Sequence, residues 1–584
     1  MGFDDVSFRG GREFLTPNID ALAYHGKILN RHYTPPMCSP SRTALLTGLY
    51  PIHTGAQHFL LFNEEPWSLL EGHQNMAKIL QQNGYSTNLI GKWHLGLGSR
   101  NFTPTYQGFD YHYGYWGGYA DYYSHSARME INSSLGYDFR RNLDIVCPDP
   151  HAYATDLFTK EAEGIILENA GSKPLFLFVS HMAPHAENND EPLKAPAEEI
   201  EKFSHIPDRK RRTYAAMVSK FDESIGKIVK ALANANMLNN SIILFYSDNG
   251  APSMGSFNNT GSNWPLKGQK NTPWEGGVRV PAAIWSPLLR NRGSLYQQPL
   301  YVGDWLPTLA AAAKIDLNLT LDGLNMWYEL KSSTTQPHDG QREILHVLDE
   351  MTNFTSYMKG KYKYIIGTTF NGQYDGVLRH RNLKVIDPRD ESYAKVILSS
   401  LTSQVLHSYD EAPLTPAKIQ LLRSQLGIKC GSQASSCGSL KEECLFNIWL
   451  DPCEQNNLAH QPKFAKLLKQ MRARVEWLRK DAVKPKIGGS LAEYDPSRHN
   501  CMWTNYLEEP PTEYTLKCDY NSPTPLCQDN IESQPVARLT KEEETVKPEA
   551  SSARPQPLCK GAVSDSDSDS DSVNETVLAA ESGD

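Results

Sequence analysis

The stretch Ile242-Ile-Leu-Phe-Tyr-Ser-Asp-Asn-Gly250 joins an unbroken apolar run to a polar turn. Because the run has no alternating polar positions, it is typical of a strand buried on both faces, and we expect that strand over Ser241–Ser247. Strands of this kind belong to largely parallel sheets that helices cover on both sides. Ligands of such sheets bind beyond the carboxyl ends of the strands, where Asp248 and Asn249 would project.

Helices and apolar strands alternate from about residue 40 to residue 315. The pattern predicts a helix over Asn75–Gln82 that stops at Gly84, a residue suited to the left-handed cap, and then a strand over Tyr85–Ile90. A second apolar strand is expected at Pro174–Ser180, and a long amphipathic helix over Arg212–Leu238 leads into the 241–247 strand. The predicted fold class is α/β, with a mainly parallel sheet and helices on both faces.

A further helix is expected before the Pro174–Ser180 strand. Thr155 or Asp156 can cap its amino end, because their side-chain oxygens accept hydrogen bonds from the first turn. Its apolar face includes the following residues: Leu157, Phe158, Ala162, Ile165 and Ile166.

The character of the chain changes past about residue 340. Short hairpin-like segments such as Tyr357–Ile366 precede a cysteine-rich region, which predicts a smaller α+β domain over residues 341–527 after a catalytic domain over residues 1–340. Residues 528–584 are rich in Pro, Ser, Glu and Asp and contain the Ser-Asp run Ser564–Ser572. We expect a disordered acidic tail there, because it has too little apolar surface to offset its ordering entropy.

Composition excludes several classes of protein. At 584 residues the chain is too long for one compact core, and 40% apolar with 21% charged residues is an ordinary globular balance. The 58 basic and 67 acidic residues give a net charge of −9, so the basic footprint of a nucleic-acid binder is absent. Residues 541–584 alone hold 11 acids and 4 bases, which leaves the body nearly neutral. No apolar run approaches the roughly 18 residues of a transmembrane segment.

The segment Cys38-Ser-Pro-Ser-Arg-Thr-Ala-Leu-Leu-Thr-Gly48 carries the first chemical signal. Cys38 precedes a proline and an apolar-periodic stretch, so we expect it at a helix amino terminus, where the dipole and unpaired N–H groups favour an anion. Arg42 follows one turn later. A cysteine here is either a nucleophile of low pKa or a buried thiol, and composition alone favours the thiol.

A second block, Gly84-Tyr-Ser-Thr-Asn-Leu-Ile-Gly-Lys-Trp-His-Leu-Gly96, places Lys92 and His94 just past a predicted strand. Seen alone, these two residues are better interpreted as a surface lysine and a capping histidine. Asp248-Asn249-Gly250 is likewise a common turn.

Two more candidates follow the predicted strands. His185 comes after the Pro174–Ser180 strand, with His181 as a competitor for the same role. Lys270 lies in Asn263-Trp-Pro-Leu-Lys-Gly-Gln-Lys270, with Lys267 as its competitor.

Taken together, these blocks resemble the sulfatase family, whose motif is Cys-x-Pro-Ser-Arg followed by Thr-Gly, and whose second element is Gly-Tyr-x-Thr with Gly-Lys-Trp-His-Leu-Gly. The spacing is similar to that of arylsulfatase B and its close relatives, as are Asn263-Trp-Pro-Leu and Asp121-Tyr-Tyr-Ser-His125. The resemblance covers about residues 2–460. It implies an alkaline-phosphatase-like sheet with a smaller carboxyl-terminal domain.

The resemblance implies a sulfuric ester hydrolase acting on aryl sulfates or sulfated carbohydrates, such as a glycosaminoglycan galactosamine 4-sulfate. In this family the formylglycine-generating enzyme of the endoplasmic reticulum oxidises the motif cysteine, here Cys38, to formylglycine, whose hydrate attacks the sulfate sulfur. A calcium ion would be held by Asp248, Asn249 and the modified Cys38, because calcium prefers hard oxygen ligands.

The same resemblance assigns roles to the remaining candidates. Arg42 and Lys92 would hold the formylglycine, and Lys270 would bind sulfate oxygens together with Lys92 and His185. His94 and His185 would transfer protons.

The amino terminus departs from the family pattern. Members have a strand ending in an Asp-Asp pair, then a hydrophobic residue, Gly, an aromatic residue, a variable residue and Asp-Val, and Met1-Gly-Phe-Asp-Asp-Val6 begins at that hydrophobic residue. Asp4 and Asp5 are therefore expected to be decoys, three positions past the metal-binding pair, and no signal peptide is present as written. The departure keeps a second class open, a catalytically inactive relative that binds sulfated glycans. A phosphohydrolase of the same superfamily is less favoured, because those enzymes use Ser or Thr as the nucleophile.

Cysteines and sequons point to an oxidising compartment. Nine of the ten cysteines lie outside the Cys38 motif, and none has Cys-x-x-Cys zinc spacing, so disulfides are the better interpretation. Seven Asn-x-Ser/Thr sequons begin at Asn101, Asn132, Asn239, Asn258, Asn318, Asn353 and Asn574. The expected location, from the family, is lysosomal or secreted.

Overall fold

The computed structural model describes residues 1–508 and the strand 516–518, apart from residues 12, 131–133, 188–190, 256–257, 333–340, 379–390, 411, 431–436, 439, 441 and 490–491. The acidic tail predicted over residues 528–584, Cys527, and the sequons at Asn132 and Asn574 lie outside the described residues.

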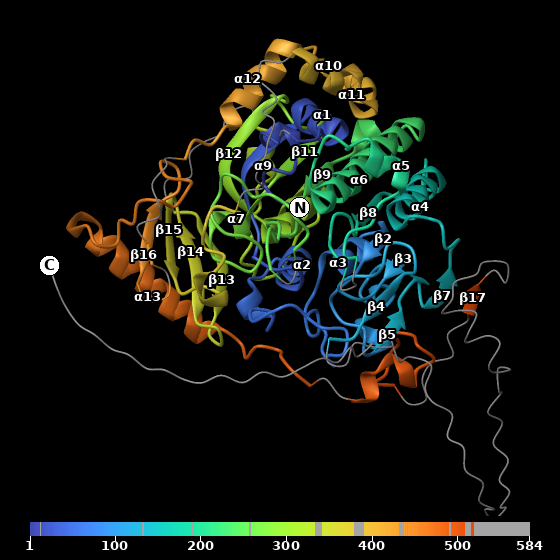
Figure 1. Cartoon of the computed structure of the whole chain (residues 1–584), viewed down its shortest axis with the longest axis horizontal. Helices are drawn as coiled ribbons and strands as arrows, with labels where there is room; N and C mark the ends of the chain where they lie inside the picture. Colours follow the sequence, from blue (N-terminus) through green and yellow to red (C-terminus); the bar gives the residue numbers. More distant parts are fainter. Residues whose placement is uncertain are drawn as a thin grey trace, which may run out of the picture. The chain divides into compact units, whose positions relative to one another are not determined.

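The strand predicted over residues 241–247 lies in a five-stranded sheet, called sheet A (Figure 1). Its order is β10-β1-β11-β9, and β12 also pairs with β1. Strands β1 and β12 are parallel, whereas β11 runs antiparallel to both β1 and β9. The strands of sheet A are β1 (Lys27–Tyr33), β9 (Ile243–Tyr246), β10 (Arg279–Val280), β11 (Ala282–Trp285) and β12 (Ser294–Tyr301).

A six-stranded sheet, called sheet B, has the order β17-β7-β6-β3-β2-β8. At one end of this order β2 pairs in parallel with β3 and with the terminal strand β8, whereas β6 is antiparallel to β3 and β7. The two sheets are thus mixed, with three neighbouring parallel strands at one end of sheet B, and the α/β class is confirmed. The strands of sheet B are β2 (Ser86–Lys92), β3 (Tyr111–Tyr115), β6 (Arg140–Arg141), β7 (Asp144–Cys147), β8 (Leu175–Ser180) and β17 (Leu516–Cys518).

Helices cover both faces of the sheets and create two separate apolar cores. Successive residues of β2 divide between them: Leu89 packs in one core with α3 (Met76–Gln82), and Ile90 packs in the other with α4 (Ala154–Glu168). The first core also takes residues of α2 (Cys38–Thr47), and the second takes residues of α1 (Pro17–His25) and α6 (Arg209–Asn234). This two-sided burial explains the lack of polar alternation in the strands.

The helix predicted to end at Gly84 is confirmed as α3, where Asn75 accepts a hydrogen bond from the Lys78 N–H at 3.1 Å and Gly84 has a φ of +84°. The prediction that Thr155 or Asp156 caps the next helix is wrong, because α4 begins at Ala154 and its cap is Tyr153. The Tyr153 hydroxyl donates to the Lys194 carbonyl at 3.0 Å, which holds the residue before the helix and moves the start toward the amino end. The long helix α6 starts at Arg209, after Asp208, which accepts from the Arg211 N–H.

A four-stranded antiparallel sheet, called sheet D, begins at residue 343, and its β14–β15 pair confirms the hairpin predicted over residues 357–366. The proposed domain boundary at residue 340 stays a prediction. Sheet D contains β13 (Glu343–Asp349), β14 (Phe354–Lys359), β15 (Tyr362–Ile366) and β16 (Cys444–Asn447). The remaining strands are β4 (Ser126–Arg128) and β5 (Leu135–Tyr137), and the remaining helices are α5 (Ala197–Glu201), α7 (Glu275–Val278), α8 (Trp305–Ala312), α9 (Trp327–Lys331), α10 (Glu391–Ser399), α11 (Leu401–Leu406), α12 (Pro416–Leu426) and α13 (Ala465–Asp481).

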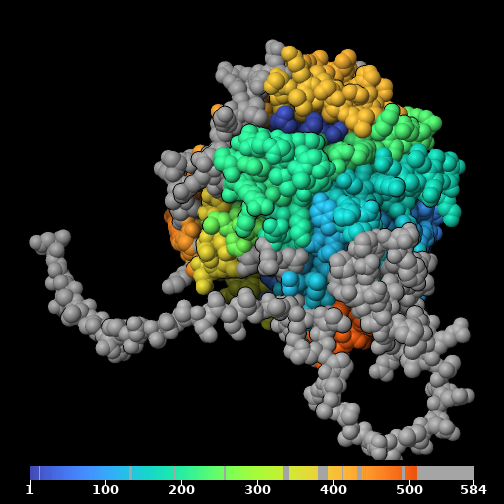
Figure 2. All heavy atoms as spheres, turned by 45° about the vertical axis from the view of Figure 1, so that its right-hand side comes forward, coloured from blue at the N-terminus to red at the C-terminus, as the bar shows by residue number. Residues whose placement is uncertain are grey.

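Helices from the carboxyl-terminal half pack against α1 near the amino terminus. Figure 2 shows α10–α12, in amber, lying over the dark blue of α1. The Tyr393 hydroxyl donates to Asp20 of α1 at 2.6 Å, so this contact includes a buried polar link.

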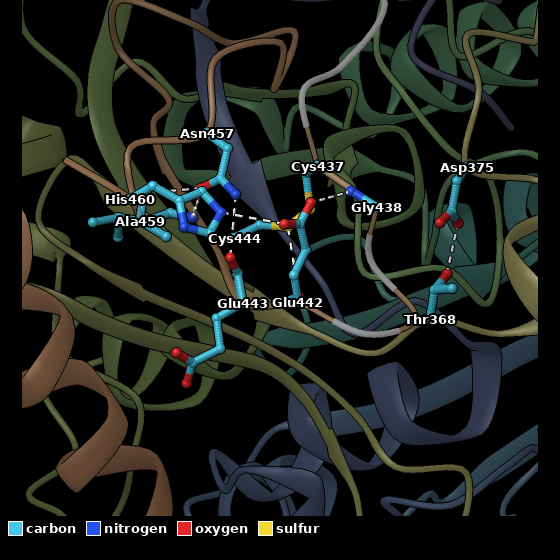
Figure 3. Close-up of a disulfide and its surroundings, with 11 residues drawn as sticks. Thr368, Asp375, Cys437, Gly438, Glu442, Glu443, Cys444, Asn457, Ala459 and His460 are labelled. Atoms are coloured by element: carbon cyan, nitrogen blue, oxygen red, sulfur yellow. Dashed lines mark hydrogen bonds and ion pairs between the residues drawn. A yellow bond between two sulfur atoms is a disulfide. The ribbon is translucent and has the colours of Figure 1, made fainter.

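The predicted disulfides are present in the described part of the cysteine-rich region. Cys430 pairs with Cys453, and Cys437 pairs with Cys444 (Figure 3). Glu442 lies beside the second pair, close enough for the three side chains to hold a metal ion, but the two sulfur atoms are bonded to each other and are not available as ligands. Cys147 and Cys501 are also disulfide-bonded.

Strands β8 and β9 are the terminal strands of sheets B and A, respectively, within the described chain. The apolar side chains of β8, Leu175 to Val179, are only half-buried, and so are Ile243, Leu244 and Tyr246 of β9. Both apolar strands therefore present an edge that no described strand covers. No helix among the described residues is long and apolar enough to cross a membrane.

Candidate active site

Cys38 is the first residue of α2, as predicted, and its side chain is buried with 1% exposed. Cys38 is a free thiol, whereas six other cysteines are in disulfides: Cys147, Cys430, Cys437, Cys444, Cys453 and Cys501. The thiol therefore lies at a helix amino terminus, where the helix dipole stabilises negative charge.

Lys270 and His185 converge on this thiol from distant parts of the chain. The Lys270 Nζ atom donates to Cys38 Sγ at 3.2 Å and lies 3.3 Å from His185 Nε2. His185 Nδ1 lies 2.6 Å from the Ala186 carbonyl oxygen, so Nδ1 carries the proton and Nε2 faces the Lys270 ammonium as an acceptor. Burial and the Lys270 charge together lower the pKa of His185, which keeps the ring neutral.

Burial alone raises the pKa of the Cys38 thiol, but the Lys270 and Lys92 ammonium groups outweigh it and hold that pKa well below its ordinary value. His185 and His94 add hydrogen bonds that act in the same direction. Cationic groups thus surround the position at which an anion would develop.

Lys92 and His94 lie at the carboxyl end of β2, as expected for the ligand-binding edge. Burial lowers the pKa of Lys92 to about 8 and that of His94 to about 4. His94 Nε2 lies 2.8 Å from the Leu61 carbonyl oxygen, so Nε2 carries the proton. With Nε2 protonated, the buried Nδ1 atom is the acceptor nitrogen of the ring.

Arg42 joins the ends of three strands. Its Nη1 atom donates to the Lys92 carbonyl of β2 at 3.1 Å and to Ser180 Oγ of β8 at 2.8 Å. Its Nη2 atom lies 3.6 Å from Asp248 Oδ2, just past β9. The guanidinium thus ties the nucleophile helix to both sheets.

Asp248 and Asn249 follow β9 directly and offer oxygen atoms suited to calcium. Asn249 is 4% exposed, its Nδ2 donates to the Gly250 carbonyl, and its buried Oδ1 has no hydrogen-bond partner among the described residues. An unpartnered buried oxygen beside a carboxylate fits a metal ligand. Calcium takes about 6–8 oxygen ligands. Asp248 and Asn249 offer oxygen atoms of the right type, but they supply only part of the ligands that the ion needs.

The competing residues occupy structural positions. His181 lies 3.0 Å from Ser224 Oγ, between Phe158 and Phe221. The Lys267 ammonium lies 3.2 Å above the Trp274 ring. The structure therefore brings His185 and Lys270, rather than these two, to Cys38.

Asp4 and Asp5 are engaged away from Asp248 and Asn249. Asp5 pairs with Arg211 at 2.8 Å and accepts hydrogen bonds from the Tyr214 hydroxyl and the Ser262 N–H. Asp4 accepts from Ser262 Oγ at 3.2 Å. These partners are consistent with the expectation that both are decoys.

Three features of the site are absent from the sequence prediction. Ser180 binds Arg42, and the rule that ligands gather at strand ends could have indicated it. Ser39 accepts from the Leu61 N–H at 3.0 Å and lies 3.2 Å from His94 Nε2, so it links α2 to the segment 60–65. That segment lines the cavity in front of Cys38, and nothing in its composition indicates this position.

The arrangement suits the capture of a tetrahedral anion. A helix amino terminus, two lysines and an arginine meet at a buried nucleophile position, with two neutral histidines next to it. The positive groups can neutralise charge on anionic oxygens, and the histidines can exchange protons with an attacking or leaving oxygen.

Comparison with known proteins identifies the family. The model of the sulfatase family matches residues 1–315, more than half of the chain. The chain is 32% identical to arylsulfatase J of Mus musculus over 87% of its own length and 79% of that protein. It is 31% identical to N-acetylgalactosamine-6-sulfatase of Homo sapiens over 56% of the chain and 63% of the relative. The chain belongs to the sulfatase family. The predicted special similarity to arylsulfatase B stays a prediction.

Solved structures agree with the fold. The crystal structure of Ps i-CgsB, also determined in complex with k-i-k-neocarrahexaose, is 26% identical to the chain, with a TM-score of 0.62 over 83% of this chain and 92% of that one. PsFucS1 sulfatase from Pseudoalteromonas sp., 21% identical, has a TM-score of 0.58 over 84% of this chain and 90% of that one, which supports the fold alone. The alkaline-phosphatase-like class with a smaller carboxyl-terminal sheet is confirmed.

Proposed function

We propose that this chain hydrolyses sulfate esters through a formylglycine made from Cys38, with a calcium ion at Asp248 and Asn249. The observation that carries the proposal is the convergence of Lys270 and His185 on the free, buried Cys38 at the start of α2. When present, the hydrated formylglycine supplies the nucleophile for the sulfate sulfur, and calcium neutralises charge on the sulfate oxygens.

The residues of the chain would bind and orient the ester. Lys270 and Lys92 would hold sulfate oxygens, and Arg42 would fix the nucleophile helix against the ends of the strands. His185 and His94 would move protons at the leaving oxygen and at the nucleophile, because burial keeps both rings neutral. Within this proposal the natural substrate class is galactosamine 4-sulfate esters; the N-acetylgalactosamine-6-sulfatase relatives support a sulfated galactosamine, and the 4-position is part of the proposal alone.

The proposal includes maturation in the secretory pathway by the formylglycine-generating enzyme, with a lysosomal or secreted product. The disulfides Cys430–Cys453 and Cys437–Cys444 support an oxidising compartment. A second candidate function is a non-catalytic protein that binds sulfated glycans. The Asp248 carboxylate lies 3.6 Å from the Arg42 guanidinium, a positive partner that competes with a bound cation, and this contact favours the second candidate.

The test compares the full chain with its Cys38→Ala variant, both made through the secretory pathway, on 4-nitrophenyl sulfate. Hydrolysis by the parent chain and its loss in Cys38→Ala are the expected results, because the nucleophile is made from that side chain. Equal turnover by both proteins would exclude the formylglycine mechanism. Binding of a sulfated glycan without turnover by the parent chain would favour the second candidate.

A further inference from the structure

The cavity in front of Cys38 has a second half that the reaction itself does not use. Beyond His94, His185 and Lys270, its walls come from the segment 60–64 and from six further residues: Gly118, Tyr119, Arg128, Glu130, Ala186 and Glu187. The same segment also lines an adjoining cavity. We call the shared wall the leaving-group wall, and it consists of Leu60, Leu61, Phe62, Glu64 and Glu130. A sulfate held at Lys270 would direct the rest of its ester toward this wall.

The leaving-group wall is acidic and apolar, in contrast to the cationic sulfate end. Glu64 and Glu130 face both cavities, and Glu65 lines the second. The cations nearby are Arg128 in the first cavity and Lys486 in the second. Lys486 donates to the Ser68 carbonyl at 2.7 Å, which holds its charge at the protein wall. Carboxylates in this position disfavour a leaving group that is itself anionic.

Glu64 differs from its neighbour in its hydrogen bonding. It is 1% exposed, and Oε1 accepts from the Glu130 N–H at 3.1 Å, but the buried Oε2 has no partner in the described structure. Glu65 has both oxygens engaged, by the Phe62 N–H at 2.8 Å and the Gly488 N–H at 2.9 Å. A buried carboxyl oxygen without a hydrogen-bond partner destabilises the folded protein, so a bound ligand that donates a hydrogen bond to it would be favoured. Burial also raises the pKa of Glu64 to about 7.

We propose that Glu64 is a specificity residue for the leaving group, and that its Oε2 accepts a hydrogen bond from a hydroxyl or amide group of a neutral sugar ring. The apolar face of the ring would lie on Leu61 and Phe62. This inference rests on the proposed sulfatase activity and narrows it to esters of neutral, hydroxyl-bearing sugars, with uronate-rich polyanions disfavoured.

The experiment compares kcat/KM on two substrates for the parent chain, Glu64→Leu and the control Glu65→Gln. The probes are 4-nitrophenyl sulfate, whose leaving group has only the reacting oxygen, and N-acetylgalactosamine 4-sulfate, whose ring presents hydroxyl and amide donors. Glu64→Leu is expected to lower kcat/KM on the sugar by about tenfold and to change the aryl value by less than about twofold, because it removes one hydrogen bond. Glu65→Gln should leave the ratio of the two values unchanged, since both of its oxygens already have protein partners.

A second arm tests the exclusion of anionic leaving groups. Above about pH 7, where Glu64 is ionised, the same sulfated sugar joined to a glucuronate should have a lower kcat/KM than the monosaccharide for the parent chain. Glu64→Gln, which removes the charge at constant size, should narrow that difference in kcat/KM.

An unchanged sugar-to-aryl ratio in Glu64→Leu, or equal losses on both substrates, would overturn the inference while leaving the proposed function standing. A uronate-linked substrate that the parent chain prefers would do the same. If the parent chain hydrolyses none of the esters, the proposed function fails, and this inference fails with it.

Discussion

The Lys270 ammonium lies 3.2 Å from the sulfur of Cys38, although 232 residues separate the two in the chain. The contact crosses from α2 to the loop after β9, so it exists only in the folded protein. Among the charged groups, Lys270 lowers the pKa of Cys38 the most, so the titration of Cys38 reports whether the site is assembled.

In protein that keeps Cys38 as a thiol, Lys270→Met should shift the titration of that thiol to higher pH, because the nearest positive charge is removed. The pH dependence of alkylation by iodoacetamide measures the midpoint. Lys267→Met is the matched control, since Lys267 lies over Trp274 and not at Cys38. The same midpoint in Lys270→Met and in the parent chain would contradict the assignment.

Activity should fall as the pH rises through about 8, where Lys92 loses its proton and its charge. Burial lowers the pKa of this lysine from its ordinary value, so the cationic form needed for sulfate binding is present below that pH and lost above it. Lys92→Arg should move this alkaline limb of the kcat/KM profile upward, because a guanidinium stays charged. Lys267→Arg, whose lysine also has a pKa of about 8, should leave the limb in place.

Asp248→Ala and Asn249→Ala should each lower the calcium content of the purified protein and its activity together, because each removes one oxygen ligand. Inductively coupled plasma mass spectrometry measures the molar ratio of calcium to protein. Asp4→Ala is the control and should retain the metal, since Asp4 binds Ser262 instead. If the calcium content is unchanged in both Asp248→Ala and Asn249→Ala, the ion does not bind at these two residues.

Asp5→Ala should lower the free energy of unfolding by about 1–3 kcal/mol, because the buried Tyr214 hydroxyl and Ser262 N–H lose their acceptor, while Arg211 keeps its second carboxylate partner, Glu13. Urea titration measures the change. Glu191→Ala, which breaks only an exposed pair with Arg209, should cost less than about 1 kcal/mol. If Asp5→Ala removes calcium from protein that is still folded, Asp5 is a ligand and not a decoy.

Removal of residues 541–584 should leave the melting temperature and kcat unchanged, because this segment has few apolar side chains to contribute to a core. The deletion takes away 11 acids and 4 bases, so the net charge changes from −9 to −2 and the isoelectric point rises. Calorimetry and isoelectric focusing check the two effects. A large drop in melting temperature would show that the segment packs against the rest of the chain.

Periodicity was sufficient for β2, whose residues divide between two apolar cores, and for β8 and β9, whose unbroken apolar runs indicate strands although the side chains of these two edge strands are largely half-buried. It was insufficient for the start of α4, where a tertiary contact of Tyr153 decides the boundary. The motif residues were found because their spacing is distinctive. Ser180, Ser39 and Glu64 were not, because each acts through a partner more than twenty residues away that local sequence cannot indicate.

The contacts of Arg42 couple the two sheets mechanically. Sheets A and B share no ladder hydrogen bond in the described chain, yet this one guanidinium touches the ends of β2 and β8 in one sheet and the residue after β9 in the other. A strand advances about 3.3 Å per residue, so sliding one sheet past the other by half a residue would exceed the tolerance of a hydrogen bond. Sliding of one sheet past the other would therefore displace Arg42 and with it the helix that begins with Cys38, so the alignment of the nucleophile depends on how firmly the two sheets are held in register.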